Sequence, residues 1–241
     1  MITGSIRQII TFLDEPMRLL ITLFLIPFLS FFSQTATAKS DWELEKVEED
    51  YQLKIYTREI GNSDLKEFKG EMFVDTKLST IVALLTDAKA APEWMNRCEQ
   101  FEVLERLEDH HLIVYFVNGA PWPVSDRDAV ISSKLTQDPK TLAVRIDVKA
   151  LTGYYPKNDD YVRIPRMVGF WEFIPQASGK VLVRYQVHAE PGGSLPAWLA
   201  NSVVVDTPYN TMTNMLEMLK REKYITAQIP YITNADTPSA E

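Results

Sequence analysis

Hydrophobic and polar residues alternate along most of the chain between residues 41 and 190. In residues 141–150, aliphatic side chains at the even positions alternate with mostly polar ones at the odd positions, and residues 181–187 show the same period. A period of two predicts antiparallel strands with one buried and one solvated face. Weaker signals of this kind cover residues 51–60, 68–74, 101–107, 112–117, 129–135 and 168–174.

Helical spacing occurs in two places. Residues 77–87 predict a short helix, and a longer amphipathic helix follows near the end of the chain. One stripe of that helix consists of Trp198, Val205, Tyr209, Met212, Leu216 and Leu219. Pro208 lies inside it and predicts a kink or a break. Many strands, one short helix and a long terminal helix indicate an α+β domain, with a curved sheet folded around the long helix.

The N-terminal region resembles an export signal. Residues 19–32 are apolar and uncharged, and this run is shorter than the roughly 20 residues that a membrane-spanning helix needs. The small-residue sequence A-T-A at residues 36–38 suits a signal peptidase. Residues 1–38 are therefore interpreted as a signal peptide of an exported, periplasmic protein, with Met17 as an alternative start. An uncleaved membrane anchor formed by residues 19–38 is the alternative.

Composition narrows the classes of partner and of chemistry. The net charge is −8 and no basic cluster occurs, which argues against nucleic acid as a partner. Cys98 is the only cysteine and is expected to be a small buried hydrophobic residue. His110 and His111 fall on a predicted hairpin tip, and His188 falls on a solvated strand face. We therefore expect no metal site, no cofactor and no catalytic residue.

Four segments resemble one known family. The most informative is A-P-W-P-V-S-D-R-D at residues 120–128, in which two prolines exclude an inner strand or a helix. The others are D-A-K-A-A-P-E-W at residues 87–94, Y-P-K-N-D-D-Y-V-R-I at residues 155–164, which leads into W-E-F, and P-G-G-S-L-P-A-W-L-A-N at residues 191–201. In this order they resemble the START domains, the lipid-transfer family related to the steroidogenic acute regulatory protein. The domain is expected over residues 39–225, followed by a C-terminal tail at 226–241.

The resemblance implies a helix-grip fold, in which the C-terminal helix closes a U-shaped antiparallel sheet around an apolar tunnel. It also implies a lid at residues 151–162, with Tyr154 and Tyr155 facing the entrance. Asp126, Arg127 and Asp128 are expected in an ion-pair and turn cluster at a strand entry, with contact to a ligand headgroup as the alternative. The residues expected to line the cavity are Trp94, Tyr115, Ser133, Trp171, Tyr185, Trp198, Val205, Tyr209 and Met212.

The family's devices for binding headgroups are missing. No arginine stands in the A-A-P-E sequence before Trp94, and Ser133 occupies the position where sterol-binding members carry an arginine. A weakly polar ligand, such as a sterol, a hopanoid-like lipid or an acyl lipid, is therefore expected. The predicted function is non-enzymatic lipid binding and transfer by a monomer with transient membrane contact. The alternatives are a lipid sensor or accessory of a membrane complex, and a polyketide cyclase-like enzyme on the same scaffold.

Overall fold

The computed structural model describes residues 41–61, 63–108, 110–195 and 197–235. The predicted signal or anchor segment lies outside the described residues, and so do residues 236–241.

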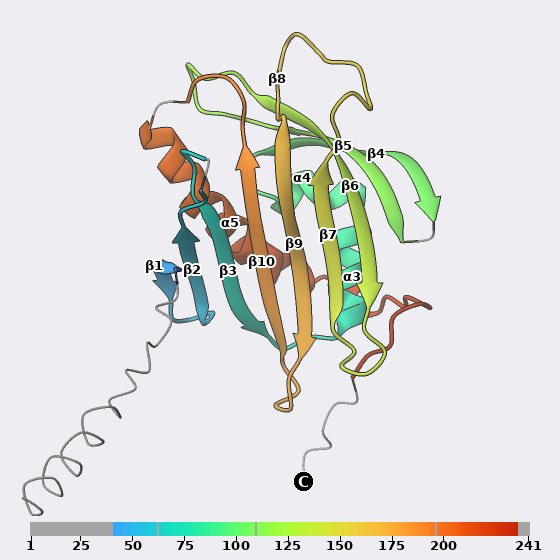
Figure 1. Cartoon of the computed structure of the whole chain (residues 1–241). Helices are drawn as coiled ribbons and strands as arrows, with labels where there is room; N and C mark the ends of the chain where they lie inside the picture. Colours follow the sequence, from blue (N-terminus) through green and yellow to red (C-terminus); the bar gives the residue numbers. More distant parts are fainter. Residues whose placement is uncertain (1–40, 62, 109, 196, 236–241) are drawn as a thin grey trace, which may run out of the picture. The chain divides into compact units, whose positions relative to one another are not determined.

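One large sheet forms the body of this domain (Figure 1). Its strands follow the order β1-β2-β3-β10-β9-β7-β6-β5-β4 and are antiparallel, while the short β8 pairs in parallel with β6. The two outer strands, β1 and β4, do not pair with each other, so the sheet stays open. The strands are β1 (Glu43–Glu48), β2 (Leu53–Arg58), β3 (Glu67–Val74), β4 (Cys98–Glu108), β5 (His111–Asn118), β6 (Arg127–Gln137), β7 (Val144–Ala150), β8 (Val162–Arg163), β9 (Arg166–Pro175) and β10 (Val181–Glu190).

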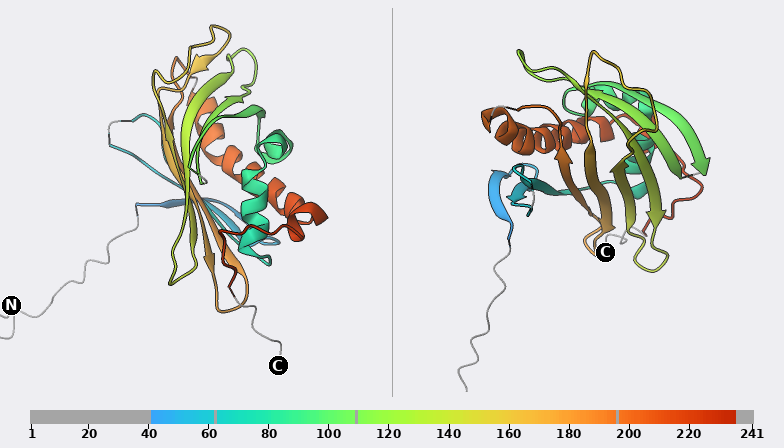
Figure 2. Two further views of the ribbon diagram at one scale, coloured as in Figure 1. Left: turned by 90° about the vertical axis from the view of Figure 1, so that its right-hand side faces the viewer. Right: turned by 45° about the horizontal axis from the view of Figure 1, so that its top comes forward.

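The helices lie on one face of the curved sheet (Figure 2). They are α3 (Leu78–Thr86), α4 (Ala91–Trp94), α5 (Ala197–Leu219) and α6 (Glu222–Ile225), with a 3-10 turn, η3 (Ala88–Ala90), before α4. None of the helices in the described residues is long and apolar enough to cross a bilayer. The predicted α+β class, with a curved antiparallel sheet and a long C-terminal helix, is confirmed.

The predicted elements differ from the structure in a few places. All eight predicted strand regions form strands, whereas β1 and β8 were not predicted. Helix α5 runs through Pro208 without the predicted break. A proline removes one backbone hydrogen bond, and the helical bonds on both sides of it remain. Pro208 is itself buried, so packing also holds the chain in the helical path.

Helix α5 packs closely on β2 and β3. A β-carbon placed on Gly70 would lie only 2.3 Å from the Met212 sulfur, so the helix reaches β3 because position 70 has no side chain. Met212 and Met215 are fully buried there, and they join the core that contains Leu53 and Ile55. This contact fixes the C-terminal half of α5 against one side of the sheet.

The segment after α6 packs back onto the domain, although residues 226–241 were expected as a tail. Ile232 is buried in the main core. The Asn234 side chain accepts a hydrogen bond from the backbone N–H of Ser79 at 2.9 Å. Helix α3 has no side-chain cap at Lys77, so this bond satisfies a donor of its first turn.

A buried ionic cluster joins the outer face of the sheet to the loop that follows β7. Asp128 is fully buried and accepts two hydrogen bonds from the Arg163 guanidinium, each 2.8 Å long. It also accepts one from the Tyr115 hydroxyl at 3.1 Å. Arg163 further donates to the backbone oxygens of Tyr155 and Pro156. Burial, together with the Asp128 charge, raises the pKa of Tyr115 to about 12, so its hydroxyl stays protonated as a donor.

Removing one member of this cluster is expected to destabilise the domain strongly. Asp128→Asn would leave the Arg163 guanidinium buried without its counter-charge, which typically costs about 3–5 kcal/mol of unfolding free energy. The control is Glu217→Gln, because Glu217 forms an exposed pair with Lys220 and should change stability by less than about 1 kcal/mol. Urea unfolding of both variants measures the difference. Equal, small losses would show that the buried cluster contributes little.

Candidate functional site

A cavity of about 550 Å³ lies between the helices and the inner face of the sheet. Most of its wall is aliphatic or aromatic. The sheet contributes Phe101, Leu112, Phe116, Ile131, Ser133, Leu135, Ile146, Val148, Trp171, Tyr185 and Val187, while the helices contribute Leu84, Leu85, Trp94, Leu199, Val203, Thr207 and Thr211.

The cavity exists because α5 has two inward-facing surfaces: one packs on the sheet and the other faces an open space. Its predicted stripe packs against β2, β3 and their core. A second row at four-residue spacing, Leu199, Val203, Thr207 and Thr211, lines the cavity. Because two of its four members are threonines, a search for apolar periodicity does not find this row. Its spacing of four is the signal that could have revealed it.

Aromatic rings form a layered patch in the cavity wall. The Trp171 ring stacks on Tyr185 with a centroid distance of 3.8 Å, and Trp94 meets Trp171 edge-on at 6.2 Å. Phe68 packs edge-on against Tyr185 at a centroid distance of 5.0 Å. Burial raises the pKa of Tyr185 well above its ordinary value, so the hydroxyl remains a neutral hydrogen-bond donor. The patch combines a large apolar area with one polar group.

Four of the predicted lining residues meet in the wall of this cavity: Trp94, Ser133, Trp171 and Tyr185. Trp198 belongs to α5, but its side chain is outside the described residues. The remaining four, described next, do not line the cavity.

Val205, Tyr209 and Met212 lie on the other surface of α5. Met212 fills the space above Gly70. The Tyr209 hydroxyl donates to Glu48 at 3.0 Å, and the Lys46 ammonium lies 3.3 Å from the centre of the Tyr209 ring. The predicted stripe is therefore the surface that attaches the helix to the sheet.

Tyr115 points to the outer face of the sheet. Neighbouring residues of a strand face opposite ways, and Leu112 and Phe116 take the cavity side of β5. Tyr115 instead joins Ile113, Val117 and Val130 in a separate apolar cluster. Both faces of β5 are thus apolar, so the outer one needs a cover of its own.

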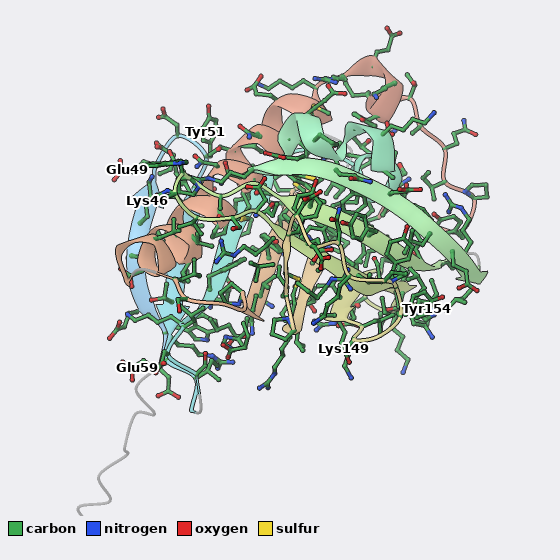
Figure 3. The ribbon with its side chains drawn as sticks, turned by 90° about the horizontal axis from the view of Figure 1, so that it is seen from above. Lys46, Glu49, Tyr51, Glu59, Lys149 and Tyr154 are labelled. Atoms are coloured by element: carbon green, nitrogen blue, oxygen red, sulfur yellow. The ribbon has the colours of Figure 1, made fainter. Side chains whose placement is uncertain are left out.

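The loop between β7 and β8 provides that cover. The Tyr155 ring packs on Tyr115 at 5.4 Å, and the Tyr154 hydroxyl donates to Glu105 of β4. In Figure 3, Tyr154 lies on the same side as the exposed Lys149, away from helix α5. The expectation that Tyr154 and Tyr155 face the cavity entrance is therefore corrected: they lie against the outer surface of the sheet.

Unpaired polar atoms gather at the cavity. Within the described residues, four buried side-chain atoms have no hydrogen-bond partner: Trp94 Nε1, His110 Nδ1, Arg127 Nε and His188 Nδ1. The first three belong to residues of the cavity wall. Buried polar groups normally have partners, so this concentration points to a ligand with polar atoms. The sequence had placed His110 on a solvated hairpin tip and Arg127 in an ion-pair cluster.

Cys98 also contributes to the wall. Burial, and then the Glu99 charge, raises the pKa of its thiol to about 11. Since the thiolate is the reactive form, the thiol is a poor nucleophile near neutral pH. The described residues contain no group of three or more histidine, cysteine, aspartate or glutamate side chains that could hold a metal ion.

Comparison with known proteins identifies the family. The START domain model matches residues 29–224, which is most of the chain. The chain therefore belongs to the START domain family, as the four sequence segments indicated.

Three relatives illustrate the similarity. An uncharacterized protein of Pseudomonas aeruginosa is 35% identical over 175 residues, covering 73% of this chain and 85% of the relative. The crystal structure of a STAR-related lipid transfer protein from Xanthomonas axonopodis superposes with a TM-score of 0.69 at 38% identity, covering 75% of this chain and 99% of that one. Human StAR-related lipid transfer protein 5 shares the fold, with a TM-score of 0.67 at 14% identity over 76% of this chain and 88% of that one.

Proposed function

We propose that the protein binds a single lipid in the cavity between α5 and the sheet and carries it between membranes without covalent chemistry. The cavity supports this most directly. Its volume of about 550 Å³ falls within the range of roughly 300–1,000 Å³ that is typical of small-molecule sites. Its wall is mainly apolar, so burial of a hydrocarbon ligand is favourable. Membership of the START family supports the same function.

Filling part of the cavity should weaken lipid binding without disturbing the sheet. Val148 lines the cavity from β7, and its neighbour Lys149 is exposed on the outer face. Val148→Trp should weaken binding of a fluorescent fatty acid or a fluorescent sterol by about tenfold or more, because overpacking costs 1–3 kcal/mol. Lys149→Trp adds the same side chain on the outside and should bind like the wild type. If both variants bind equally well, the lipid sits elsewhere.

Contact with a membrane is supported by the loop between β5 and β6. Pro121 in this loop lines the cavity, while the adjacent Trp122 side chain is 91% exposed. Tryptophan favours the interface between water and bilayer, where its ring is partly buried. We therefore expect Trp122 to enter the membrane surface while the lipid passes into or out of the cavity.

Trp122→Ala should slow lipid transfer between vesicles by about tenfold, since burial of an aromatic ring contributes about 1.5–3 kcal/mol. Binding of lipid in solution should remain unchanged. Tyr154→Ala is the matched control, because Tyr154 is a half-exposed aromatic residue on the outer face of the sheet. Equal rates for the Trp122 variant and the wild type would exclude this loop as the membrane contact.

We place this activity outside the cytoplasm. The apolar run at residues 19–32 and the A-T-A sequence at residues 36–38 support export. N-terminal sequencing of the protein from the periplasmic fraction should begin at Lys39. A membrane-embedded form that still begins at Met1 or Met17 would instead support an anchor.

A further inference from the structure

Arg127 is turned toward the cavity, away from the acid next to it in the sequence. It is the first residue of β6, its side chain is 7% exposed, and it lines the cavity. Asp128 faces the other side of the strand and is held by Arg163. The alternation of side chains along a strand therefore separates Arg127 from Asp128. The cluster expected at the R-D sequence is therefore two separate groups. Asp128 pairs with Arg163 on the outer face, and Arg127 stands alone on the cavity side.

The Arg127 guanidinium lacks a counter-charge. Its Nη1 donates to the backbone oxygen of Ser125, but Nε has no partner and Nη2 donates to no described residue. The Asp126 charge acts on it electrostatically, yet an Asp126 oxygen accepts from the Ala120 N–H at 2.7 Å, and no ion pair with Arg127 forms. Burial lowers the pKa of Arg127, which reflects this poorly compensated environment. Buried charges in proteins are normally paired, so the site is incomplete without an anion.

Most of the other charged residues in the cavity wall are also cationic. Its charged residues are Lys66, Arg97, Arg106, Arg127 and Asp87. The one acid, Asp87, is bonded to Lys223 at 3.0 Å. A chain with a net charge of −8 thus encloses a mainly apolar cavity in which four of the five charged residues of the described wall are cationic. This distribution favours a negatively charged ligand over a neutral one.

We propose that Arg127 binds the anionic group, a carboxylate or a phosphate, of an acyl lipid whose hydrocarbon chain occupies the cavity. The inference rests on the proposed lipid-binding function and specifies the ligand class within it. Nε and Nη2 form one edge of the planar guanidinium, and this edge matches two oxygens of either anion. Sterols and other neutral lipids would leave the charge uncompensated. The ligand therefore differs from the weakly polar one expected from the sequence.

The test compares ligands that share one chain and differ in their head. Purified, delipidated protein is titrated at pH 8 with oleate, with oleoyl lysophosphatidate and with oleyl alcohol, each displacing the neutral dye Nile red. The wild type should bind at least one of the two anions about tenfold or more tightly than the alcohol, since hydrogen bonds to charged groups contribute about 1.5–3 kcal/mol. The preferred anion shows whether the natural head is a carboxylate or a phosphate.

Three variants separate a specific site from general electrostatics. Arg127→Met should lose about 10–100-fold in affinity for the preferred anion and keep its affinity for the alcohol. Arg127→Lys keeps the charge but not the two-donor edge, so its affinity for the anion should lie between those of the wild type and Arg127→Met. Lys149→Met removes one charge from the exposed outer face of the sheet and should retain the anion binding.

The outcomes distinguish this inference from the function on which it rests. Alcohol bound as tightly as both anions, or an equal loss of all ligands in Arg127→Met, would overturn the anion site and leave lipid binding intact. Equal losses of anion affinity in the Lys149 and Arg127 variants would assign the effect to the overall charge of the protein and would also overturn the anion site. If the wild type binds none of the three ligands, the proposed function itself fails. If Arg127→Met does not fold, the ligand preference of the wild type and the anion affinity of Arg127→Lys still test the anion site.

Discussion

The close approach of α5 to β3 at Gly70 is the contact on which the rest of the structure depends. A helix seated at one side of a wide, curved sheet covers only the strands beneath it, here β2 and β3. Part of the inner faces of β5, β6, β7, β9 and β10 then borders the cavity with mostly apolar side chains. The cavity is therefore a result of where the helix attaches, and its apolar character follows from ordinary strand alternation.

Strand alternation also divides the chemistry of the domain between two faces. On the outer face, Asp128, Arg163 and Tyr115 satisfy one another and hold the loop that follows β7. Around the cavity, Trp94, His110 and Arg127 keep polar atoms without protein partners. The first set stabilises the fold and the second is available for a ligand, although Arg127 and Asp128 are neighbours in the sequence.

The sequence predicted the fold well because both of its signals are local. Alternation of hydrophobic and polar residues predicted β7 and β10, and hydrophobic residues at helical spacing predicted α3 and α5. The cavity wall was predicted less well, because the apolar stripe of α5 does not reveal whether it faces a sheet or a space. Met212 and Tyr209 pack on the sheet, whereas the row containing Thr207 and Thr211 faces the cavity. Tyr115 and Tyr155 were misplaced for a related reason: β5 is apolar on both faces, and only the tertiary structure shows which face is enclosed.

Position 70 has a mechanical consequence. The C-terminal half of α5 packs against β3 at Gly70, while the N-terminal half lies over the cavity. The helix is therefore anchored at the bare backbone of Gly70. A methyl group added at position 70 would lie 2.3 Å from the Met212 sulfur, so the Met212 side chain would have to move. One added methyl group would thus disturb the contact that anchors a helix whose other half lines the cavity.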